Sequence, residues 1–338
     1  MRPRRSAPLL VLAFVLASCA PAASPSVAQP PVMTPVTLLL SYQPDVQFAP
    51  FYLAQQAGYY RDAGLNVTIQ HKSESDLIRL VADGQAQFGV ADATDVMISR
   101  TAGIPVKYVS TLYQAFPVAL IGPKGKVPAN PADLRGKRIG TPGRYGSSWA
   151  ALLGVLQAGG LTAADVTIRE YPQFNQVDGL LNGDVDLITG FRTNEPLRLA
   201  AQGMQVDMLT IDKVAPLPGP GLIVGDALLN ATDSRVAEFA AATLKAQQAI
   251  AANPQLGLDA ATVVVPAIAS EKATALAVLK ASIELWRGSG AQPSGSINQA
   301  VWFAGYDTMR RLGLIAGSVS LADMTFDVLS KISGSPAP

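Results

Sequence analysis

The chain has 338 residues, of which 49% are hydrophobic and 15% are charged, and its net charge is +1. This length can bury a substantial core and is typical of two domains, while the balanced charge and the lack of a basic run argue against nucleic acid as a partner. The chain has a single cysteine, Cys19, and a single histidine, His71, which excludes an internal disulfide, a thiolate metal cluster and a histidine-rich metal site.

The first residues, 1–18, have the pattern of a signal peptide. Arginines near the start precede an apolar run over residues 7–17, which is too short for a spanning helix of roughly 20 residues. Residues 16–19 read Leu-Ala-Ser-Cys and resemble the bacterial lipobox, in which the chain is cut before Cys19 and the sulfur is diacylated. The alternative is an ordinary secretory signal with an incidental cysteine. Residues 19–35 are rich in Pro, Ala and Ser and predict a lipid-anchored, extended tether.

From residue 36 onward, strand and helix patterns alternate, with short turns that contain glycine. The first series predicts strands over residues 36–42, 65–70, 86–92 and 106–113. It predicts helices over residues 48–64, 73–85 and 93–103. Gly64 is expected to end the first helix. This alternation is typical of an α/β domain with a largely parallel sheet.

A stretch rich in Pro, Gly and Lys, residues 124–137, precedes a second α/β series. This series predicts strands over residues 137–142, 166–172, 186–191 and 205–211. It predicts helices over residues 147–160, 175–185 and 195–203. Further helices are predicted after the Pro- and Gly-rich segment 214–221, over residues 234–252, 271–286 and 299–313.

Segments with Pro and Gly interrupt the pattern near residues 121–125 and 214–221. We expect the chain to cross between two lobes at these segments. Residues 36–121 together with 217–338 are assigned to the first lobe, and residues 122–216 are assigned to the second. Hinged lobes with a cleft between them are a common arrangement for closing around a ligand.

Several segments are together similar to type II solute-binding lipoproteins of ABC importers. They lie in residues 41–69, 80–109, 133–143 and 182–196 and include the sequences APFYLAQQAGYY, AGLNV, DLRGKRIGTPG and NGDVDLITGFRTNEP. The branch that they resemble includes binders of thiamine pyrimidine precursors and the eukaryotic pyrimidine synthases. The resemblance covers roughly residues 36–285. Within that branch, the chain looks most like the lipoproteins assigned to riboflavin import.

The resemblance implies a two-lobed fold of the periplasmic-binding-protein type with a hinged cleft. It also implies a permease and an ATPase as partners, and a lipid-anchored position on the extracytoplasmic side of the cell membrane. The implied ligand is a flat vitamin-type heterocycle, with riboflavin favoured. The alternatives are a thiamine pyrimidine precursor, a sulfonate- or nitrate-type anion, and a sensory or scaffold role without transport.

The resemblance also leaves open an enzyme like the pyrimidine synthases. Those enzymes carry a cysteine-rich motif and use a histidine as part of their own substrate. This chain has no cysteine after position 19, and His71 is interpreted as a solvated loop histidine. The chain is therefore interpreted as a binder, with no catalytic residue, cofactor or metal.

Candidate ligand contacts are the residues that follow the ends of the predicted strands, because ligands of doubly wound sheets bind there. Aromatic side chains can stack on a flat ring, and polar side chains can pair with its heteroatoms. The predicted contacts are Tyr42, Gln43, Phe48, Asp92, Thr94, Tyr113, Tyr145, Ser147, Asn194 and Glu195. Phe51 is assigned to the core.

Some of these residues have a second interpretation. Asp92 or Thr94 could instead cap the following helix, and Glu195 could be a favourable charge at a helix N-terminus. The glycine-rich turn in residues 140–152 runs into a helix, whose free backbone N–H groups would suit an anion or a polar carbonyl. Two arginines nearby, Arg144 and Arg192, keep the anion alternative open.

Overall fold

A computed structural model describes residues 33–212, 214–229 and 234–332. The predicted signal peptide, Cys19 and most of the predicted tether lie outside these residues. Within the part of the chain that is described, no helix combines the length and the apolar character required to cross a membrane.

The first of two five-stranded sheets has the strand order β2-β1-β3-β10-β4. Its strands are β1 (Thr34–Leu40), β2 (Leu65–His71), β3 (Phe88–Ala91), β4 (Val106–Thr111) and β10 (Gly221–Gly225). β1 is parallel to β2 and β3, whereas β10 is antiparallel to β3 and β4. The predicted largely parallel sheet is confirmed, because β1, β2, β3 and β4 run in the same direction. Only β10, which enters between β3 and β4 when the chain returns from the second sheet, runs in the opposite direction.

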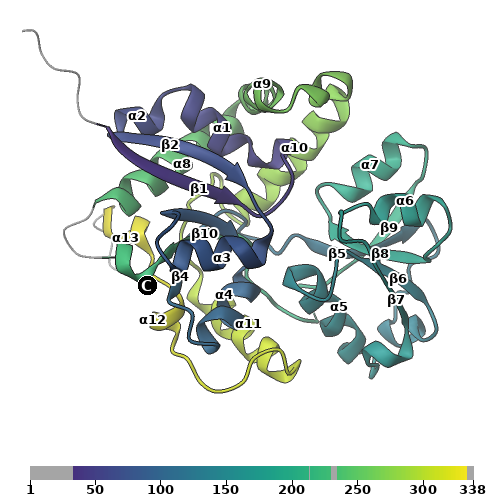
Figure 1. Cartoon of the computed structure of the whole chain (residues 1–338). Coiled ribbons are helices and arrows are strands. Elements are labelled where there is room, and N and C mark those ends of the chain that lie inside the picture. The colour runs from purple at the N-terminus through teal and green to yellow at the C-terminus, as the bar shows by residue number, and fades with distance from the viewer. Residues whose placement is uncertain (1–32, 213, 230–233, 333–338) are drawn as a thin grey trace, which may run out of the picture. The chain divides into compact units, whose positions relative to one another are not determined.

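Helices cover both faces of the first sheet (Figure 1). Successive leucines of β1 face opposite sides, so Leu38 and Leu40 join one hydrophobic cluster and Leu39 joins the other. The first cluster includes α1 (Ala49–Gln56), α2 (Tyr59–Asp62), α8 (Arg235–Ala252), α9 (Pro254–Val264), α10 (Lys272–Arg287) and α13 (Val328–Ile332). The second includes α3 (Glu74–Ala82), α4 (Ala93–Thr101), α11 (Gln299–Arg311) and α12 (Leu321–Met324).

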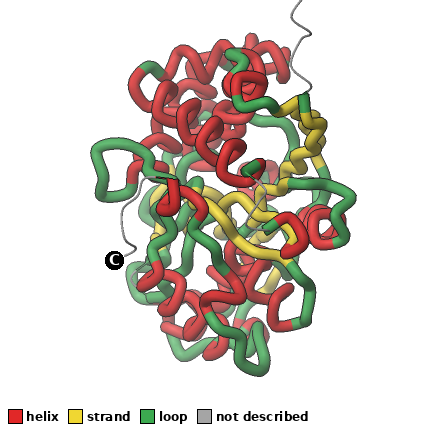
Figure 2. The backbone as a smooth tube through the Cα atoms, turned by 90° about the vertical axis from the view of Figure 1, so that its left-hand side faces the viewer, coloured by secondary structure: helices red, strands yellow, loops and turns green. Residues whose placement is uncertain are grey.

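The second sheet has the strand order β7-β6-β8-β5-β9. Its strands are β5 (Val118–Pro123), β6 (Arg138–Thr141), β7 (Thr167–Glu170), β8 (Leu187–Phe191) and β9 (Val206–Thr210). It is also mixed, because β5 is antiparallel to β8 and β9. The helices beside it are α5 (Gly146–Ala158), α6 (Gln176–Leu181) and α7 (Glu195–Ala201). Figure 2 shows the helices, strands and loops of the molecule from a direction 90° away from that of Figure 1.

We call the first sheet with its helices the first lobe, and the second sheet with α5, α6 and α7 the second lobe. β5 pairs only with strands of the second sheet among the described residues, so the chain leaves the first sheet before Val118. This crossing lies a few residues earlier than the predicted boundary after residue 121. The chain returns between β9 and β10. We propose that these two lobes are the hinged halves of a ligand-binding protein.

Two local differences from the sequence analysis have simple causes. The helix predicted over residues 48–64 is broken into α1 and α2, because Gly58 takes a left-handed conformation with φ 77° that interrupts the helical path. β10 and α9 were not predicted as separate elements. Short 3-10 helices connect the longer elements: η1 (Val46–Phe48), η2 (Pro131–Leu134), η3 (Ala163–Asp165), η4 (Asp226–Leu228) and η5 (Pro266–Ser270).

Candidate functional site

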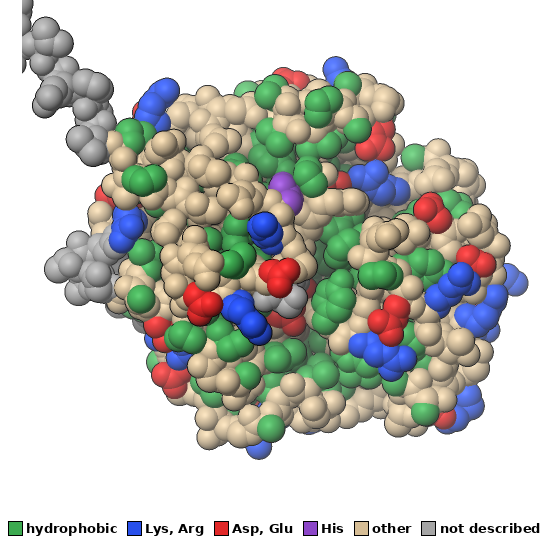
Figure 3. Space-filling view, viewed as in Figure 1, with side chains coloured by type: hydrophobic (Ala, Val, Ile, Leu, Met, Phe, Trp, Pro, Cys, Tyr) green, Lys and Arg blue, Asp and Glu red, His purple; other side chains and the backbone are tan. Residues whose placement is uncertain are grey.

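A cavity, here called the aromatic cavity, lies where segments that follow strands of both sheets come together. It is lined by eight aromatic side chains: Tyr42, Phe48, Phe51, Tyr113, Tyr145, Phe174, Phe191 and Trp286. Figure 3 shows hydrophobic side chains gathered in a hollow on the face of the molecule in view. Aromatic rings on several sides of a cavity offer flat apolar surfaces against which a planar ring can stack.

The polar lining of the aromatic cavity is neutral or acidic. Its polar side chains are Ser41, Gln47, Asp92, Ser147, Ser148, Gln176, Asn194, Glu195 and Gln247. Among the described residues, no lysine or arginine lines it. Arg144 pairs instead with Glu170, at 2.9 Å between Nε and Oε1, and Arg192 pairs with Asp212 at 3.3 Å. The geometry therefore does not favour the anion binder that these two arginines kept open.

Eight of the ten predicted ligand contacts line the aromatic cavity: Tyr42, Phe48, Asp92, Tyr113, Tyr145, Ser147, Asn194 and Glu195. Gln43 lies outside it and lines an adjoining cavity instead. Thr94 lines neither, because it is the second residue of α4 and its side chain is packed inside, with 1% of the residue exposed. Phe51 is buried in the core and also forms part of the cavity wall.

Asp92 joins the two lobes. It directly precedes α4, yet its side chain does not cap that helix. Its Oδ2 atom accepts the backbone N–H of Ser147 in the first turn of α5, at 2.8 Å. Burial raises the pKa of the Asp92 carboxyl, and the hydrogen bonds from Ser147 oppose this shift. The N-terminus of α5, expected to be open to an anion or carbonyl of the ligand, therefore already holds a carboxylate of the protein itself.

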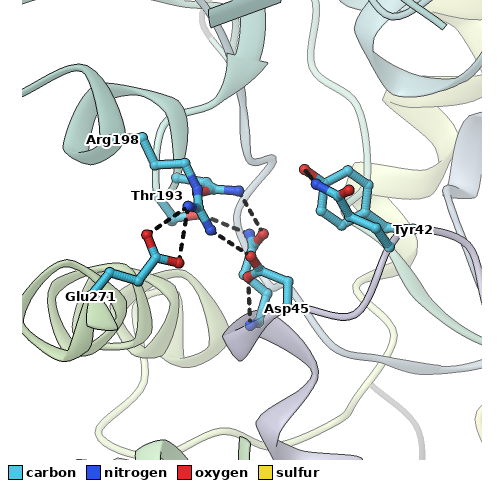
Figure 4. Close-up of polar contacts among 8 residues, drawn as sticks. Tyr42, Asp45, Thr193, Arg198 and Glu271 are labelled. Carbon is cyan, nitrogen blue, oxygen red and sulfur yellow. Dashed lines mark hydrogen bonds and ion pairs between the residues drawn. The ribbon is translucent and has the colours of Figure 1, made fainter. Parts of the chain in front are cut away.

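A second set of contacts between the lobes is centred on Arg198 of α7 (Figure 4). Its Nη2 atom pairs with Oδ2 of the buried Asp45 at 2.8 Å, and its Nη1 atom pairs with Glu271 at 3.3 Å. Asn194 accepts from Arg198 Nε at 2.6 Å and donates to Gln47 Oε1 at 3.1 Å. Burial raises the pKa of Asp45, while Arg198 and the N–H of Gln47 lower it. The amide of Asn194 thus serves to hold the lobes together as well as to line the cavity.

Glu195 and Gln176 form a buried pair in the second lobe. Glu195 accepts the backbone N–H of Phe191 at 2.8 Å and the Nε2 atom of Gln176 at 3.3 Å. Burial raises the pKa of Glu195 to about 7. The Nε2 atom of Gln176 also donates to the Thr189 carbonyl at 3.5 Å, which fixes the orientation of the amide. The Oε1 atom of Gln176 is buried and has no hydrogen-bond partner among the described residues, so it offers an acceptor to a ligand.

His71 supports the site from the first lobe. It is the last residue of β2, and its Nδ1 atom lies 2.5 Å from the Tyr42 carbonyl oxygen. A carbonyl can only accept, so Nδ1 carries the proton and Nε2 can accept from the Tyr52 hydroxyl at 3.3 Å. Burial lowers the pKa of His71. The interpretation of His71 as a solvated loop histidine is therefore wrong, because its ring holds the segment that carries Tyr42.

The residues of the cavity that the sequence analysis missed include Gln47, Phe174, Gln176, Gln247 and Trp286. Phe174 and Gln176 follow the end of β7, so their position after a strand is a signal that marks them as candidates. Gln247 and Trp286 lie on α8 and α10, far from any strand end, and no local signal marks them.

Comparison with known proteins identifies the family. The family model described as NMT1/THI5 like matches residues 45–256. The riboflavin-binding protein RibY of Chloroflexus aurantiacus is 34% identical over 311 residues, which cover 90% of this chain and 88% of that protein. A 4-amino-5-hydroxymethyl-2-methylpyrimidine phosphate synthase of Schizosaccharomyces pombe is 28% identical over 190 residues, or 54% of each protein.

A solved structure matches the fold. The alkanesulfonate-binding protein SsuA of Xanthomonas axonopodis pv. citri, bound to MOPS, superposes with a TM-score of 0.67 at 18% identity, over 89% of this chain and 100% of that one. This likeness confirms the predicted α/β fold of the periplasmic-binding-protein type. Together, the fold and the relatives support a role as a binding protein. The chain belongs to the NMT1/THI5-like family.

Proposed function

We propose that this chain is the solute-binding component of an ABC importer and captures riboflavin between its two lobes. The observation that carries the proposal is the aromatic cavity, with its eight aromatic side chains and, among the described residues, no lysine or arginine. A broad, uncharged heterocycle is the class of ligand that such a wall favours over a sulfonate or a phosphate ester, because either anion would be desolvated without a cationic partner. The relative named as a riboflavin-binding protein supports the same choice.

The polar groups of the aromatic cavity suit the edge of such a ring. The isoalloxazine ring of riboflavin has an imide N–H between two carbonyl groups. The unpartnered Oε1 atom of Gln176 could accept that N–H, which would satisfy an acceptor that is otherwise buried without a hydrogen bond. Binding would then depend on both stacking and a directional contact.

The location of the protein is part of the proposal. Cleavage before Cys19 and diacylation of its sulfur would tether the lobes on the extracytoplasmic side of the cell membrane, beside a permease with its ATPase. Mass spectrometry of the mature protein would test this, because the proposal requires an N-terminal peptide that begins with lipid-modified Cys19. An unmodified Cys19, or a cut elsewhere, would remove the anchor from the proposal without affecting the ligand site.

A titration of riboflavin fluorescence against the purified protein tests the ligand. We expect saturable quenching at micromolar concentrations or below, because the ring would stack on aromatic side chains. Phe174→Ala should weaken the quenching, whereas Phe303→Ala, which removes an exposed ring outside the cavity, should leave it unchanged. The absence of quenching with micromolar riboflavin would overturn riboflavin as the ligand.

A thiamine pyrimidine precursor is the second candidate, and the similarity to the pyrimidine phosphate synthase favours it. The free pyrimidine is uncharged and could also stack in the aromatic cavity. Displacement of bound riboflavin by the free hydroxymethylpyrimidine would support this candidate. Turnover is a separate question, and it would be tested by incubating the protein with pyridoxal phosphate and iron and assaying for a pyrimidine product. We expect none, because the chain has no cysteine after Cys19 to supply a cysteine-rich motif.

A further inference from the structure

A second cavity, here called the polar cavity, adjoins the aromatic cavity. Tyr42, Phe174, Asn194 and Glu195 line both. Among the described residues, the polar cavity has only two aromatic side chains, Tyr42 and Phe174, and it has five side-chain amides, which come from Gln43, Gln173, Asn175, Asn194 and Gln202. An amide group can both donate and accept hydrogen bonds, and this is what a chain of hydroxyl groups requires.

Two rings mark the boundary between the cavities. Tyr42 of the first lobe and Phe174 of the second meet edge to face, with ring centroids 4.7 Å apart and an angle of 83° between the planes. Phe174 has φ 57°, and it is the only residue other than glycine with a positive φ in the described part of the chain. Such a conformation persists only where surrounding contacts impose it, and it is common at ligand sites. The fold therefore holds the Phe174 ring in place at a cost in backbone energy.

The charges of the polar cavity exclude an anionic ligand group. Four carboxyl groups line it, from Asp45, Asp178, Glu195 and Glu271, against one guanidinium, from Arg198. That guanidinium is already paired with two of the four, at 2.8 and 3.3 Å. A phosphate would meet more negative than positive charge, whereas neutral hydroxyl groups would meet amide and carboxylate partners.

We propose that the polar cavity is a subsite for an uncharged, hydroxyl-rich chain attached to the ring that occupies the aromatic cavity. The inference rests on the proposed function, since it places the ring of riboflavin in the aromatic cavity and its ribityl chain in the polar cavity. The ligand class is then a planar heterocycle with a neutral polyol tail. The ring would join the tail beside the contact between Tyr42 and Phe174, where Asn194 and Glu195 also line both cavities.

The experiment compares three flavins on the full chain by fluorescence titration. Riboflavin carries the polyol tail, lumiflavin carries the same ring with a methyl group in its place, and flavin mononucleotide carries the tail as a phosphate ester. We expect lumiflavin and flavin mononucleotide each to bind at least about tenfold more weakly than riboflavin, the loss that one or two neutral hydrogen bonds would give. In the double variant Gln173→Leu/Gln202→Leu, the preference for riboflavin over lumiflavin should shrink by a similar factor.

The control variant is Gln255→Leu, which changes an exposed glutamine of α9 that lines neither cavity and should preserve the preference. Equal affinity for riboflavin and lumiflavin would overturn the subsite while leaving the proposed function intact. Tighter binding of flavin mononucleotide than of riboflavin would also overturn it. Failure of riboflavin and lumiflavin alike to bind would overturn the proposed function and the subsite together. The comparison of ligands uses the unmodified protein, so it holds even if the double variant does not fold.

Discussion

The carboxylate of Asp92, at the end of β3, accepts the backbone N–H of Ser147, at the start of α5, over 2.8 Å. This bond joins the two lobes beside the aromatic cavity, and the carboxylate lies near the positive end of the α5 dipole. Ser147 is buried, with 1% of the residue exposed, whereas Asp92 is half-buried. This burial raises the pKa of the Asp92 carboxyl. This hydrogen bond therefore both connects the two lobes and positions two residues of the cavity wall.

Asp92→Ala should destabilise the protein more than Asp92→Asn. Alanine leaves the Ser147 N–H without its acceptor, at a cost of about 1–3 kcal/mol in the free energy of unfolding. Asparagine keeps an oxygen acceptor of the same size and removes a buried charge, so we expect its cost to be below about 1 kcal/mol. Urea unfolding of both variants at one pH measures the difference. Equal losses would show that the acceptor atom at this position is unimportant.

Arg198→Met should be strongly destabilising because it leaves Asp45 without its cation. The Asp45 side chain is 5% exposed, so its carboxylate would stay buried without an opposite charge, and the cost should be about 3 kcal/mol. Glu271→Gln is the matched control, since that side chain is 41% exposed and should cost less than about 1 kcal/mol. Urea unfolding measures both.

A double variant separates the lost pair from a general packing defect. Adding Asp45→Asn to Arg198→Met removes the buried charge that the first change left uncompensated. The double variant should therefore be more stable than Arg198→Met alone. If the two changes simply add their losses, the ion pair does not couple the lobes in the way the distances indicate.

Phe174→Gly and Phe174→Ala should differ in stability although both remove the ring. Glycine adopts φ 57° without strain, whereas alanine retains the penalty for the left-handed region, so the glycine variant should be more stable by about 1 kcal/mol. Both variants lose the contact with Tyr42, and both should bind riboflavin more weakly than the parent protein. Thermal and urea unfolding, with the same fluorescence titration, test the two parts separately. A more stable alanine variant would indicate that φ 57° carries no strain.

Much of the fold and part of the site follow from local sequence signals. Alternating patterns with glycine turns placed most strands within a few residues, because strand formation and turn conformation depend on near neighbours. The same signals located residues at strand ends, so eight of ten predicted contacts line the aromatic cavity. The prediction that Thr94 lines the cavity is wrong. The first turn of a helix presents side chains in several directions, and the spacing in the sequence does not show which of them face the cavity.

The remaining features depend on contacts between distant segments. The insertion of β10 between β3 and β4 is decided by how the chain returns from the second sheet, which no local pattern encodes. Trp286 reaches the cavity because α10 packs against η1, α8 and α9, although α10 begins more than 160 residues after β4. The contact between His71 and the Tyr42 carbonyl likewise joins the ends of two neighbouring strands. Such features can be recognised only in the three-dimensional structure.

Glu195 should make the stability of the protein depend on pH between its ordinary pKa of 4.5 and its raised pKa of about 7. The folded protein holds the proton of this carboxyl more tightly than the unfolded chain does. Its contribution to stability is therefore fully present below pH 4.5 and is lost as the pH rises through about 7. A shift of this size corresponds to a loss of up to about 3 kcal/mol.

Glu195→Gln isolates this effect because glutamine can still accept the Phe191 N–H but cannot ionise. His71, whose pKa is lowered, adds a dependence of opposite sign that is present in both proteins and cancels when they are compared. Urea unfolding at several pH values should show that the stability of the variant relative to the parent increases as the pH rises from 4.5 to 7. Glu170→Gln, at a half-exposed carboxylate of β7, controls for the general loss of a charge. A constant difference in the free energy of unfolding between Glu195→Gln and the parent over this range would contradict the prediction. It would mean that Glu195 is ionised in the folded protein, with its buried charge stabilised by the hydrogen bonds from Gln176 and the Phe191 N–H.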